Sequence, residues 1–302
     1  MATETSVDLA ALLPSWKLAL QADRKSKQTF DAYVTGVRLF LKWCERHGHA
    51  AVLDRATVRG WINDLHVGGA APATARTRQM ALKRYSAWLV EEDEADTDLI
   101  RDLKPPQLDV KVVAGLTDEQ CAALVKACQG REFIDRRDEA VVRMMIETGM
   151  RAGEVLGLTV DGVDVARGLA VVERGKGGKG RVVPFGPQVA RSVDRYLRLR
   201  RSHRLAHTEA LWLGGGGQAF AYHGLNVTLK RRADAAGITG FHLHLLRNTA
   251  ARRWLAAGGS ENGLMAVAGW STRSMLDRYT RASASDRAAV EARNLDLGNL
   301  GV

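Results

Sequence analysis

Two adjacent prolines, about a third of the way along the chain, divide it into two parts. Pro105 and Pro106 open a stretch that runs to Ala114. A proline disfavours the helical conformation in the residue before it, so we expect this stretch to be an extended linker. Thr117 then begins the pattern Thr-Asp-Glu-Gln, in which a hydroxyl and an amide three residues later cap a new helix. The sequence therefore predicts two domains, over residues 1–106 and 116–302, joined by a linker over residues 107–115.

The first domain is expected to be a bundle of amphipathic helices. Over residues 29–46, apolar side chains recur every three or four positions and form one face, and Gly48 can end that helix. Two further helices are expected over residues 57–65 and 74–90. The last of these carries four basic side chains, Arg76, Arg78, Lys83 and Arg84, which could form a solvated face or lie on DNA phosphates. The rest of the chain favours DNA, so we predict DNA contacts by Arg76, Arg78 and Lys83.

The second domain is expected to combine helices with a small sheet. The segments 169–172 and 181–184 are short and rich in β-branched residues, and the glycine-rich segment 175–180 joins them. This pattern predicts an antiparallel hairpin. Helices are expected over residues 121–128, 136–148, 189–201, 225–236, 245–257 and from 272 onwards; candidate core positions in the second of these are Val141, Val142, Met145 and Ile146. The predicted fold class is therefore mainly α with a small antiparallel β-sheet.

The net charge of +10 suggests a polyanionic partner. Residues 1–106 carry 15 Lys and Arg against 14 Asp and Glu, whereas residues 107–302 carry 29 against 20. The excess of positive charge therefore belongs to the second domain. Because many basic proteins are merely solvated, charge alone leaves nucleic acid binding open.

The chain has no sequence feature typical of a secreted or membrane protein. No uninterrupted apolar run reaches the roughly eighteen residues of a membrane span, and the N-terminus lacks the basic start and apolar stretch of a signal peptide. Cys44, Cys121 and Cys128 form no Cys-x-x-Cys pair, and an odd number argues against a disulfide framework. We expect a cytoplasmic location, without membrane contact.

The second domain contains, in order, the groups that cleavage of a phosphodiester without a metal requires. Such a reaction needs fixed cations for the growing negative charge, an acid for the leaving oxygen and a nucleophile. A histidine and an arginine three residues apart share one helical face, and a tyrosine follows a tryptophan nine residues later. The candidates are Arg151, Glu154, Lys176, His244, Arg247, Trp270 and Tyr279.

The segments around these residues read ETGMRAGEVLGL, GKGGKGRVVPFG, HLHLLRNTAARRWLAAGG and AGWSTRSMLDRYTRAS. In order and spacing they resemble the characteristic boxes of the tyrosine recombinases, such as phage integrases and Xer proteins, over residues 116–285. GKGGKG alone could be any flexible basic turn, but four boxes in the correct order, ending in a tyrosine at the correct spacing, are specific. The helical first domain resembles the core-binding domain of the same family.

The resemblance implies a role for each matching residue. Arg151 and Arg247 would bind the non-bridging oxygens of the scissile phosphate, which suit planar bidentate donors. Tyr279 would attack the phosphorus, leaving a 3′-phosphotyrosyl protein and a free 5′-hydroxyl. Lys176 would protonate the departing 5′ oxygen, and His244 would assist proton transfer from the tyrosine or donate to the phosphate. A 5′-hydroxyl of another strand would reverse the attack, so no metal, ATP or other cofactor is expected.

Four positions leave alternatives open. Lys179 shares the glycine-rich segment with Lys176 and could serve as the acid; otherwise we expect it to contact DNA. Trp270 stands where many members have histidine; its indole N–H can donate to a phosphate but cannot exchange a proton. The alternative is that Trp270 is chiefly a packing residue. Asn248 stands where the arginine is usually followed by histidine, a change expected to have little effect on chemistry. Glu154 could hold the neighbouring arginine or be a purely structural carboxylate.

The resemblance also implies partners. Lys230, Arg231 and Arg232 precede the third box, and we expect them to lie along DNA. The two domains would form a C-shaped clamp on double-stranded DNA at specific core sites, and a homotetramer would exchange strands through a Holliday junction. Residues 285–302 would dock on a neighbouring copy, the alternative being a disordered tail. A directionality factor could be a further partner.

The expected function is site-specific DNA recombination, in the integration or excision of a mobile element. Within the same family, the alternative is Xer-like resolution of replicon dimers. A relaxing enzyme of the type IB topoisomerase kind would share the chemistry, and a catalytically silent DNA-binding regulator would share the scaffold. The complete set of candidate residues argues against the silent regulator.

Overall fold

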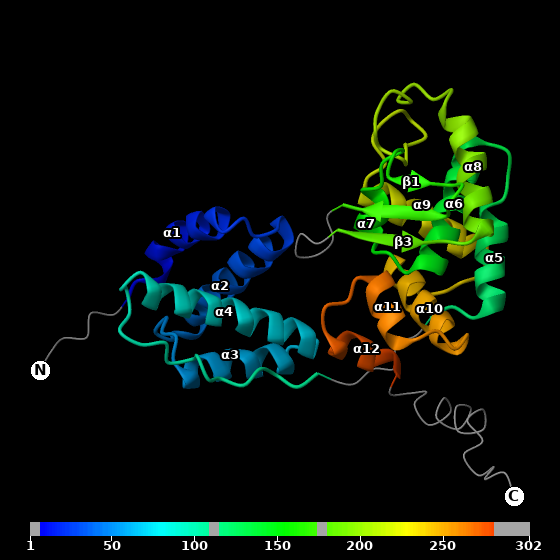
Figure 1. Cartoon of the computed structure of the whole chain (residues 1–302). Helices are drawn as coiled ribbons and strands as arrows, with labels where there is room; N and C mark the ends of the chain where they lie inside the picture. The colour runs from blue at the N-terminus through cyan, green and yellow to red at the C-terminus, as the bar shows by residue number, and fades with distance from the viewer. Residues whose placement is uncertain (1–6, 109–114, 174–179, 281–302) are drawn as a thin grey trace, which may run out of the picture. The chain divides into compact units, whose positions relative to one another are not determined.

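The structure, a computed structural model, describes residues 7–108, 115–173 and 180–280. The chain divides into two compact units, Met1–Val110 and Lys111–Val302, each with its own hydrophobic core. Over the described residues, the first unit is made of helices, and the second combines helices with one three-stranded sheet (Figure 1). The predicted fold class, mainly α with a small antiparallel sheet, is confirmed. No helix in the described ranges is both long enough and apolar enough to cross a membrane.

Polar side chains and a proline start the four helices of the first unit. Side chains of Asp8, Ser26 and Asp54 accept hydrogen bonds from backbone N–H groups at the starts of the first three helices, and a proline stands at the start of the fourth. The first helix, which includes Pro14, was not expected from the sequence. The helices are α1 (Leu9–Ala22), α2 (Lys27–His47), α3 (Arg55–Val67) and α4 (Pro72–Glu91).

Aromatic side chains fill the core of the first unit. Helix α4 packs along α2 and α3, and α1 packs on α2; Trp16, Trp61 and Tyr85 are fully buried between them. The Tyr85 hydroxyl donates a 2.7 Å hydrogen bond to the carbonyl of Leu9, which ties α4 to the start of α1. After α4 the chain turns back, and the Gln79 amide donates to two carbonyls of this returning segment. The chain is therefore held against α4 just before the predicted linker.

Helix α6 forms the centre of the second unit, where it packs against α5, α8 and α10. The predicted core positions Val141, Val142, Met145 and Ile146 are all buried, as expected. Gly149 ends α6 in the left-handed conformation, with a φ of 63°, which a residue with a side chain adopts with strain. The first helices of the unit are α5 (Asp118–Cys128), α6 (Phe133–Thr148) and α7 (Ala152–Leu156); α8 (Pro187–Arg200), α9 (Tyr222–Ala235) and α10 (Leu243–Ala256) follow the sheet.

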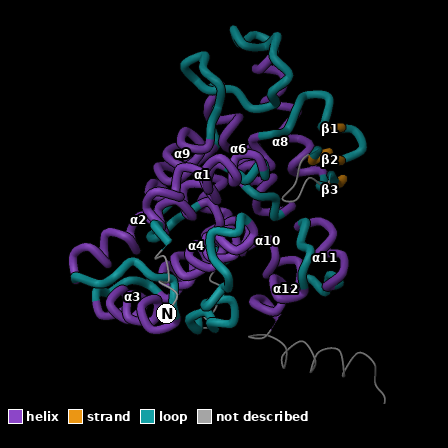
Figure 2. The backbone as a smooth tube through the Cα atoms, turned by 90° about the vertical axis from the view of Figure 1, so that its left-hand side faces the viewer, coloured by secondary structure: helices purple, strands orange, loops and turns teal. Residues whose placement is uncertain are grey.

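The sheet is the predicted hairpin with one short strand added. Strand β2 (Leu169–Val172) pairs antiparallel with β3 (Arg181–Pro184), and β1 (Val163–Asp164) pairs with the other edge of β2. Figure 2 shows the three strands nearly end-on, at the margin of the second unit. In the sequence, β3 begins directly after the glycine-rich segment, of which residues 175–179 lie outside the described residues.

A separate small core joins the last two described helices to α10. Helix α11 (Glu261–Ala268) packs against α10 and β3, and α12 (Arg273–Thr280) follows a short connection. Leu255, Leu264 and Leu276 are buried together with Trp270 and Tyr279. This cluster places the candidate nucleophile of α12 beside the helix that carries Arg247.

Candidate active site

Glu154 organises the first part of the site. Arg151 precedes α7, and its backbone N–H donates to Glu154 Oε2 at 2.8 Å. Its guanidinium donates to the other carboxylate oxygen, Oε1, also at 2.8 Å. The carboxylate of Glu154 thus caps the start of α7, as in a capping box, and also orients the side chain of Arg151. Glu154 therefore contacts the neighbouring arginine, and its role in the reaction stays a prediction.

Arg181 is a member of the site that sequence reasoning missed. It is the first residue of β3, and its guanidinium donates to both oxygens of Glu154, at 3.1 and 2.8 Å. Its Nε donates to the carbonyl of Val267 at 2.9 Å. A signal was present in the sequence, because side chains two apart on a strand share a face. Arg181 shares its face with buried Val183, so a cation there needs an internal partner.

The charge state of Glu154 follows from these contacts. Burial alone would raise the pKa of its carboxyl group, but hydrogen bonds from Arg181 and Arg151 outweigh burial and lower the pKa to about 2. The carboxylate is therefore ionised at neutral pH. It connects the strand that follows the glycine-rich segment to the first candidate phosphate-binding arginine.

Arg247 lies on α10, almost completely buried. Its two terminal nitrogens donate to the carbonyls of Gly149, at 2.6 Å, and Ala268, at 2.8 Å. Burial and the neighbouring charge of Arg151 lower the pKa of Arg247 to about 10, so it still carries its charge at neutral pH. Two of the five N–H groups of the guanidinium make these bonds, and the bonds fix the direction of the others.

The end of α11 brings the arginines to one place. Arg151 Nη2 lies 3.4 Å from the carbonyl of Gly269, one residue beyond the carbonyl that Arg247 binds. Gly269 has a φ of 64°, and a Cβ added there would lie 2.7 Å from the guanidinium carbon of Arg181. A side chain at this position would therefore strain the backbone and displace the guanidinium of Arg181.

Tyr279 is held at two points. Its ring stacks on that of Trp270, with ring centres 5.1 Å apart and planes 16° from parallel. Its hydroxyl donates a 2.7 Å hydrogen bond to Oδ1 of Asn248, the residue after Arg247. Sequence reasoning expected Asn248 to have little effect on chemistry and so missed this direct contact. The two residues are 31 positions apart, and no local pattern predicts that they meet.

Trp270 contributes an unsatisfied donor to the same cluster. Its indole Nε1 is buried and has no hydrogen-bond partner among the described residues. The guanidinium carbon of Arg247 lies 5.3 Å from the centre of the indole ring, within the range of a cation–π contact. Buried donors are rarely left unpaired in folded proteins. An acceptor supplied by a ligand would satisfy this one.

Of the three remaining candidates, the structure describes His244 only. His244 is exposed on α10, one helical turn before Arg247. Lys176 and Lys179 lie outside the described residues. No group of histidine, cysteine and acidic side chains in the described ranges could hold a metal ion.

The candidate DNA contacts of the second unit differ from one another. Lys230 and Arg231 are exposed on α9. The guanidinium of Arg232 instead points inward and forms ion pairs with Asp135, at 2.7 Å, and Asp138, at 3.0 Å. This placement gives Arg232 a structural role in joining α9 to α6, and its contact with DNA stays a prediction.

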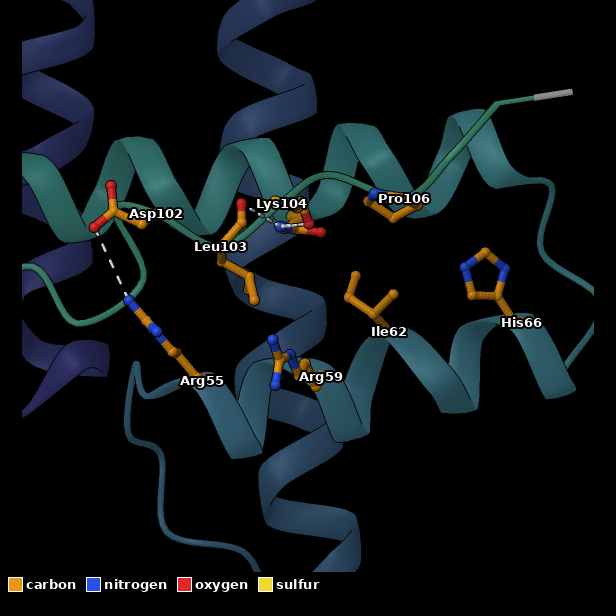
Figure 3. Close-up of a pocket in the computed structure, with 9 residues that line it drawn as sticks. Arg55, Arg59, Ile62, His66, Asp102, Leu103, Lys104 and Pro106 are labelled. Atoms are coloured by element: carbon orange, nitrogen blue, oxygen red, sulfur yellow. Dashed lines mark hydrogen bonds and ion pairs between the residues drawn. The ribbon is translucent and has the colours of Figure 1, made fainter. Parts of the chain in front are cut away.

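In the first unit, Arg76 is exposed, Arg78 is half-buried, and Lys83 donates to the carbonyl of Leu103. A separate cavity of about 520 Å³ lies between α3 and the segment that follows α4 (Figure 3). Basic side chains of Arg55, Arg59 and Lys104 line it, and Asp102 lies 3.9 Å from Arg55. Sequence reasoning did not single out this basic cavity.

Comparisons with known proteins show the family of the chain. Residues 115–286 match the phage integrase family, and residues 13–93 match the N-terminal SAM-like domain of phage integrases. Tyrosine recombinase XerC 2 of Ralstonia nicotianae is 30% identical over 283 residues, which cover 90% of this chain and 82% of that protein.

Two solved structures share the fold. The Tn1549 transposon integrase in complex with a circular intermediate DNA has 17% identity and a TM-score of 0.74, covering 96% of this chain and 100% of that one. A lambda integrase tetramer bound to a Holliday junction has 15% identity and a TM-score of 0.65, covering 87% of this chain and 77% of that one. The Ralstonia relative named above and others similar to this chain are called tyrosine recombinases. The chain therefore belongs to the phage integrase family.

Proposed function

We propose that this chain is a site-specific recombinase that cuts and rejoins duplex DNA through a covalent link between Tyr279 and a 3′ phosphate. The observation that carries the proposal is the convergence of a buried phenol and two fixed guanidinium groups, those of Arg151 and Arg247, from three separate segments. Cations held in place before the reaction stabilise charge that develops in the transition state without reorganising.

The phosphate would be bound by donors that the fold has already oriented. The guanidinium of Arg247 has N–H groups beyond the two that bind backbone carbonyls. Arg151 is held by Glu154 while its side chain stays partly exposed. The indole N–H of Trp270, which has no partner in the part of the chain that the structure describes, would donate to a phosphate oxygen. Together these groups suit a tetrahedral anion.

The chemical step would exchange one phosphate ester for another. A bond forms between the Tyr279 oxygen and phosphorus while the bond from phosphorus to the 5′ oxygen breaks. The phenol proton would pass to a base, for which we propose His244, and the 5′ oxygen would be protonated by Lys176 or Lys179. Because the ester bond is conserved, the step uses neither ATP nor any other cofactor, and a 5′-hydroxyl of another strand reverses it.

DNA would be bound by both units, in the manner of a clamp, and strand exchange would involve four copies of the chain. Exposed Lys230 and Arg231 on α9 and Arg76 on α4 support a DNA surface on each unit. The similarity in fold to a lambda integrase tetramer bound to a Holliday junction supports the assembly. A directionality factor remains a proposed partner that follows only from the family.

Integration or excision of a mobile element is the first candidate role, and the fold shared with a transposon integrase agrees with it. Xer-like resolution of replicon dimers is the second candidate. It is favoured by the 30% identity to a protein named XerC, which extends over 90% of this chain. The two roles differ in whether the recombining sites are unlike or alike.

Covalent trapping tests the proposal. Nicked duplexes tiled from the DNA that flanks the gene would be mixed with the wild-type protein and with Tyr279→Phe, and adducts would be separated on a denaturing gel. We expect a protein–DNA adduct with the wild type only, while both proteins retard the same duplexes. Sequence-specific retardation without any adduct would instead identify a silent DNA-binding regulator. In a second assay on supercoiled circles that carry two of the retarded sites, relaxed circles without joined sites would identify a topoisomerase-like enzyme.

A further inference from the structure

Asn248 provides the hydrogen-bond acceptor for the hydroxyl of the proposed nucleophile. It lies on α10 directly after Arg247, and its side chain is largely buried, at 7% exposure. Its Oδ1 accepts the hydrogen bond from Tyr279 at 2.7 Å. The contact therefore crosses from α12 to the helix that carries one of the two proposed phosphate-binding arginines.

The chemistry of a carboxamide limits what this contact can do. An amide oxygen accepts a hydrogen bond but does not take up a proton near neutral pH. Asn248 can therefore orient the hydroxyl of Tyr279 without deprotonating it, so the base must be another group. A residue that only orients the nucleophile contributes by keeping the reacting atoms close to their attacking geometry.

The hydrogen bond supplies a restraint that packing alone does not give. Stacking on Trp270 fixes the plane of the Tyr279 ring, but a stacked ring can still slide within its plane. The hydrogen bond to Asn248 fixes the position of the oxygen along that plane. Since Asn248 and Arg247 are adjacent on one helix, the oxygen is fixed relative to the guanidinium as well.

The surroundings of α12 make this restraint more important. The connection before α12 and its first turn, residues 271–274, are exposed. Leu276 and Tyr279 are the buried side chains by which the described part of α12 joins the small core. We propose that Asn248 is a positioning residue that sets the attacking geometry of Tyr279. This inference rests on the proposed function, because it assigns Tyr279 as the nucleophile.

Two substitutions separate positioning from packing. Asn248→Ala removes the acceptor, and we expect the single-turnover rate of adduct formation to fall about ten-fold, the effect of losing one net hydrogen bond. Asn248→His restores an acceptor only while the imidazole is neutral. Its rate should approach that of the wild type at pH 8 and fall towards that of Asn248→Ala below about pH 6.5. Two neighbouring groups face the introduced imidazole: Arg247 on the same helix and the hydroxyl of Tyr279 on α12. The positive charge of Arg247 would move the transition to lower pH.

The measurement is adduct formation on a nicked duplex under saturating protein, between pH 5.5 and 8.5. Thermal melting and DNA retardation would first establish that each variant folds and binds. Asn262→Ala, at an exposed position of α11, is the matched control and should behave as the wild type. If Asn248→Ala fails to fold, the pH profile of Asn248→His tests by itself whether Asn248 positions Tyr279.

The outcomes are distinct. A slower Asn248→Ala together with a recovery by Asn248→His that is confined to high pH supports positioning. The inference is overturned if Asn248→Ala reacts within two-fold of the wild type or faster, or if Asn248→His follows the wild-type profile or recovers at no pH. Failure of the wild type itself to form an adduct would refute the proposed function, which separates that failure from failure of this inference.

Discussion

Glu154→Gln tests the most concentrated electrostatic contact of the site. The substitution keeps the shape of the side chain but removes the charge that Arg151 and Arg181 share. The ordinary pKa of 4.5 falls to about 2 in the folded protein. At about 1.4 kcal/mol for each pH unit, this difference corresponds to about 3 kcal/mol of unfolding free energy at neutral pH, which the variant should lose.

The sign of the pH dependence follows from the direction of the change. A carboxyl group whose pKa is lowered by folding stabilises the protein fully above its unfolded pKa and loses that effect as the pH falls through its folded pKa. The advantage of the wild type over Glu154→Gln should therefore be about 3 kcal/mol at pH 7, decline to about 2 kcal/mol near pH 3.5 and vanish below about pH 2.

Urea denaturation of both proteins at pH 7 and pH 3.5, followed by tryptophan fluorescence, measures this difference. Glu209→Gln, at an exposed position of the same unit, is the control and should leave the unfolding free energy within about 0.5 kcal/mol of the wild type. A loss of less than about 1 kcal/mol at pH 7 for Glu154→Gln would refute the reasoning. So would a difference from the wild type that stays the same at both pH values.

Two further predictions concern single contacts. Trp270→Phe should slow adduct formation about ten-fold, because it removes an N–H that has no partner among the described residues. It should also lower the melting temperature, because the smaller ring leaves a gap in the small core; wild-type cleavage would contradict the donor role. Arg232→Ala should cost about 2 kcal/mol in urea denaturation, because it removes the ion pairs with Asp135 and Asp138 while Asp138 keeps its pairing with Arg137. Lys230→Ala should instead spare stability and lower the salt slope of DNA binding by about one, and equal losses of stability would contradict this placement.

The sequence was informative wherever a local pattern determines the structure. The hairpin strands were predicted at the residues where they occur, because β-branched runs on both sides of a glycine-rich segment leave few alternatives. Helix α1 was missed, since its start depends on a single cap, Asp8, and it contains Pro14. The predicted domain boundaries stay an expectation, although the structure also divides within the predicted linker, after Val110.

The parts of the site that could not be predicted depend on contacts between distant segments. Lys230, Arg231 and Arg232 are alike in sequence, but carboxylates on α6 turn the last of them inward. Asn248 meets Tyr279 only because α11 and its glycine turn bring α12 back against α10. Spacing identifies which residues have suitable chemistry. The partner of each one is set by the path of the chain between them.

The arrangement around Glu154 also determines the electrostatic balance of the site. Among the described residues, the guanidinium groups of Arg151, Arg181 and Arg247 and one carboxylate leave a local charge of +2. A phosphodiester carries one negative charge, whereas the five-coordinate state formed by attack of a phenolate carries two. The two negative charges of the transition state therefore balance the +2 of these four side chains, whereas the single charge of the bound phosphodiester does not. Such a site favours the reacting phosphate over the resting one.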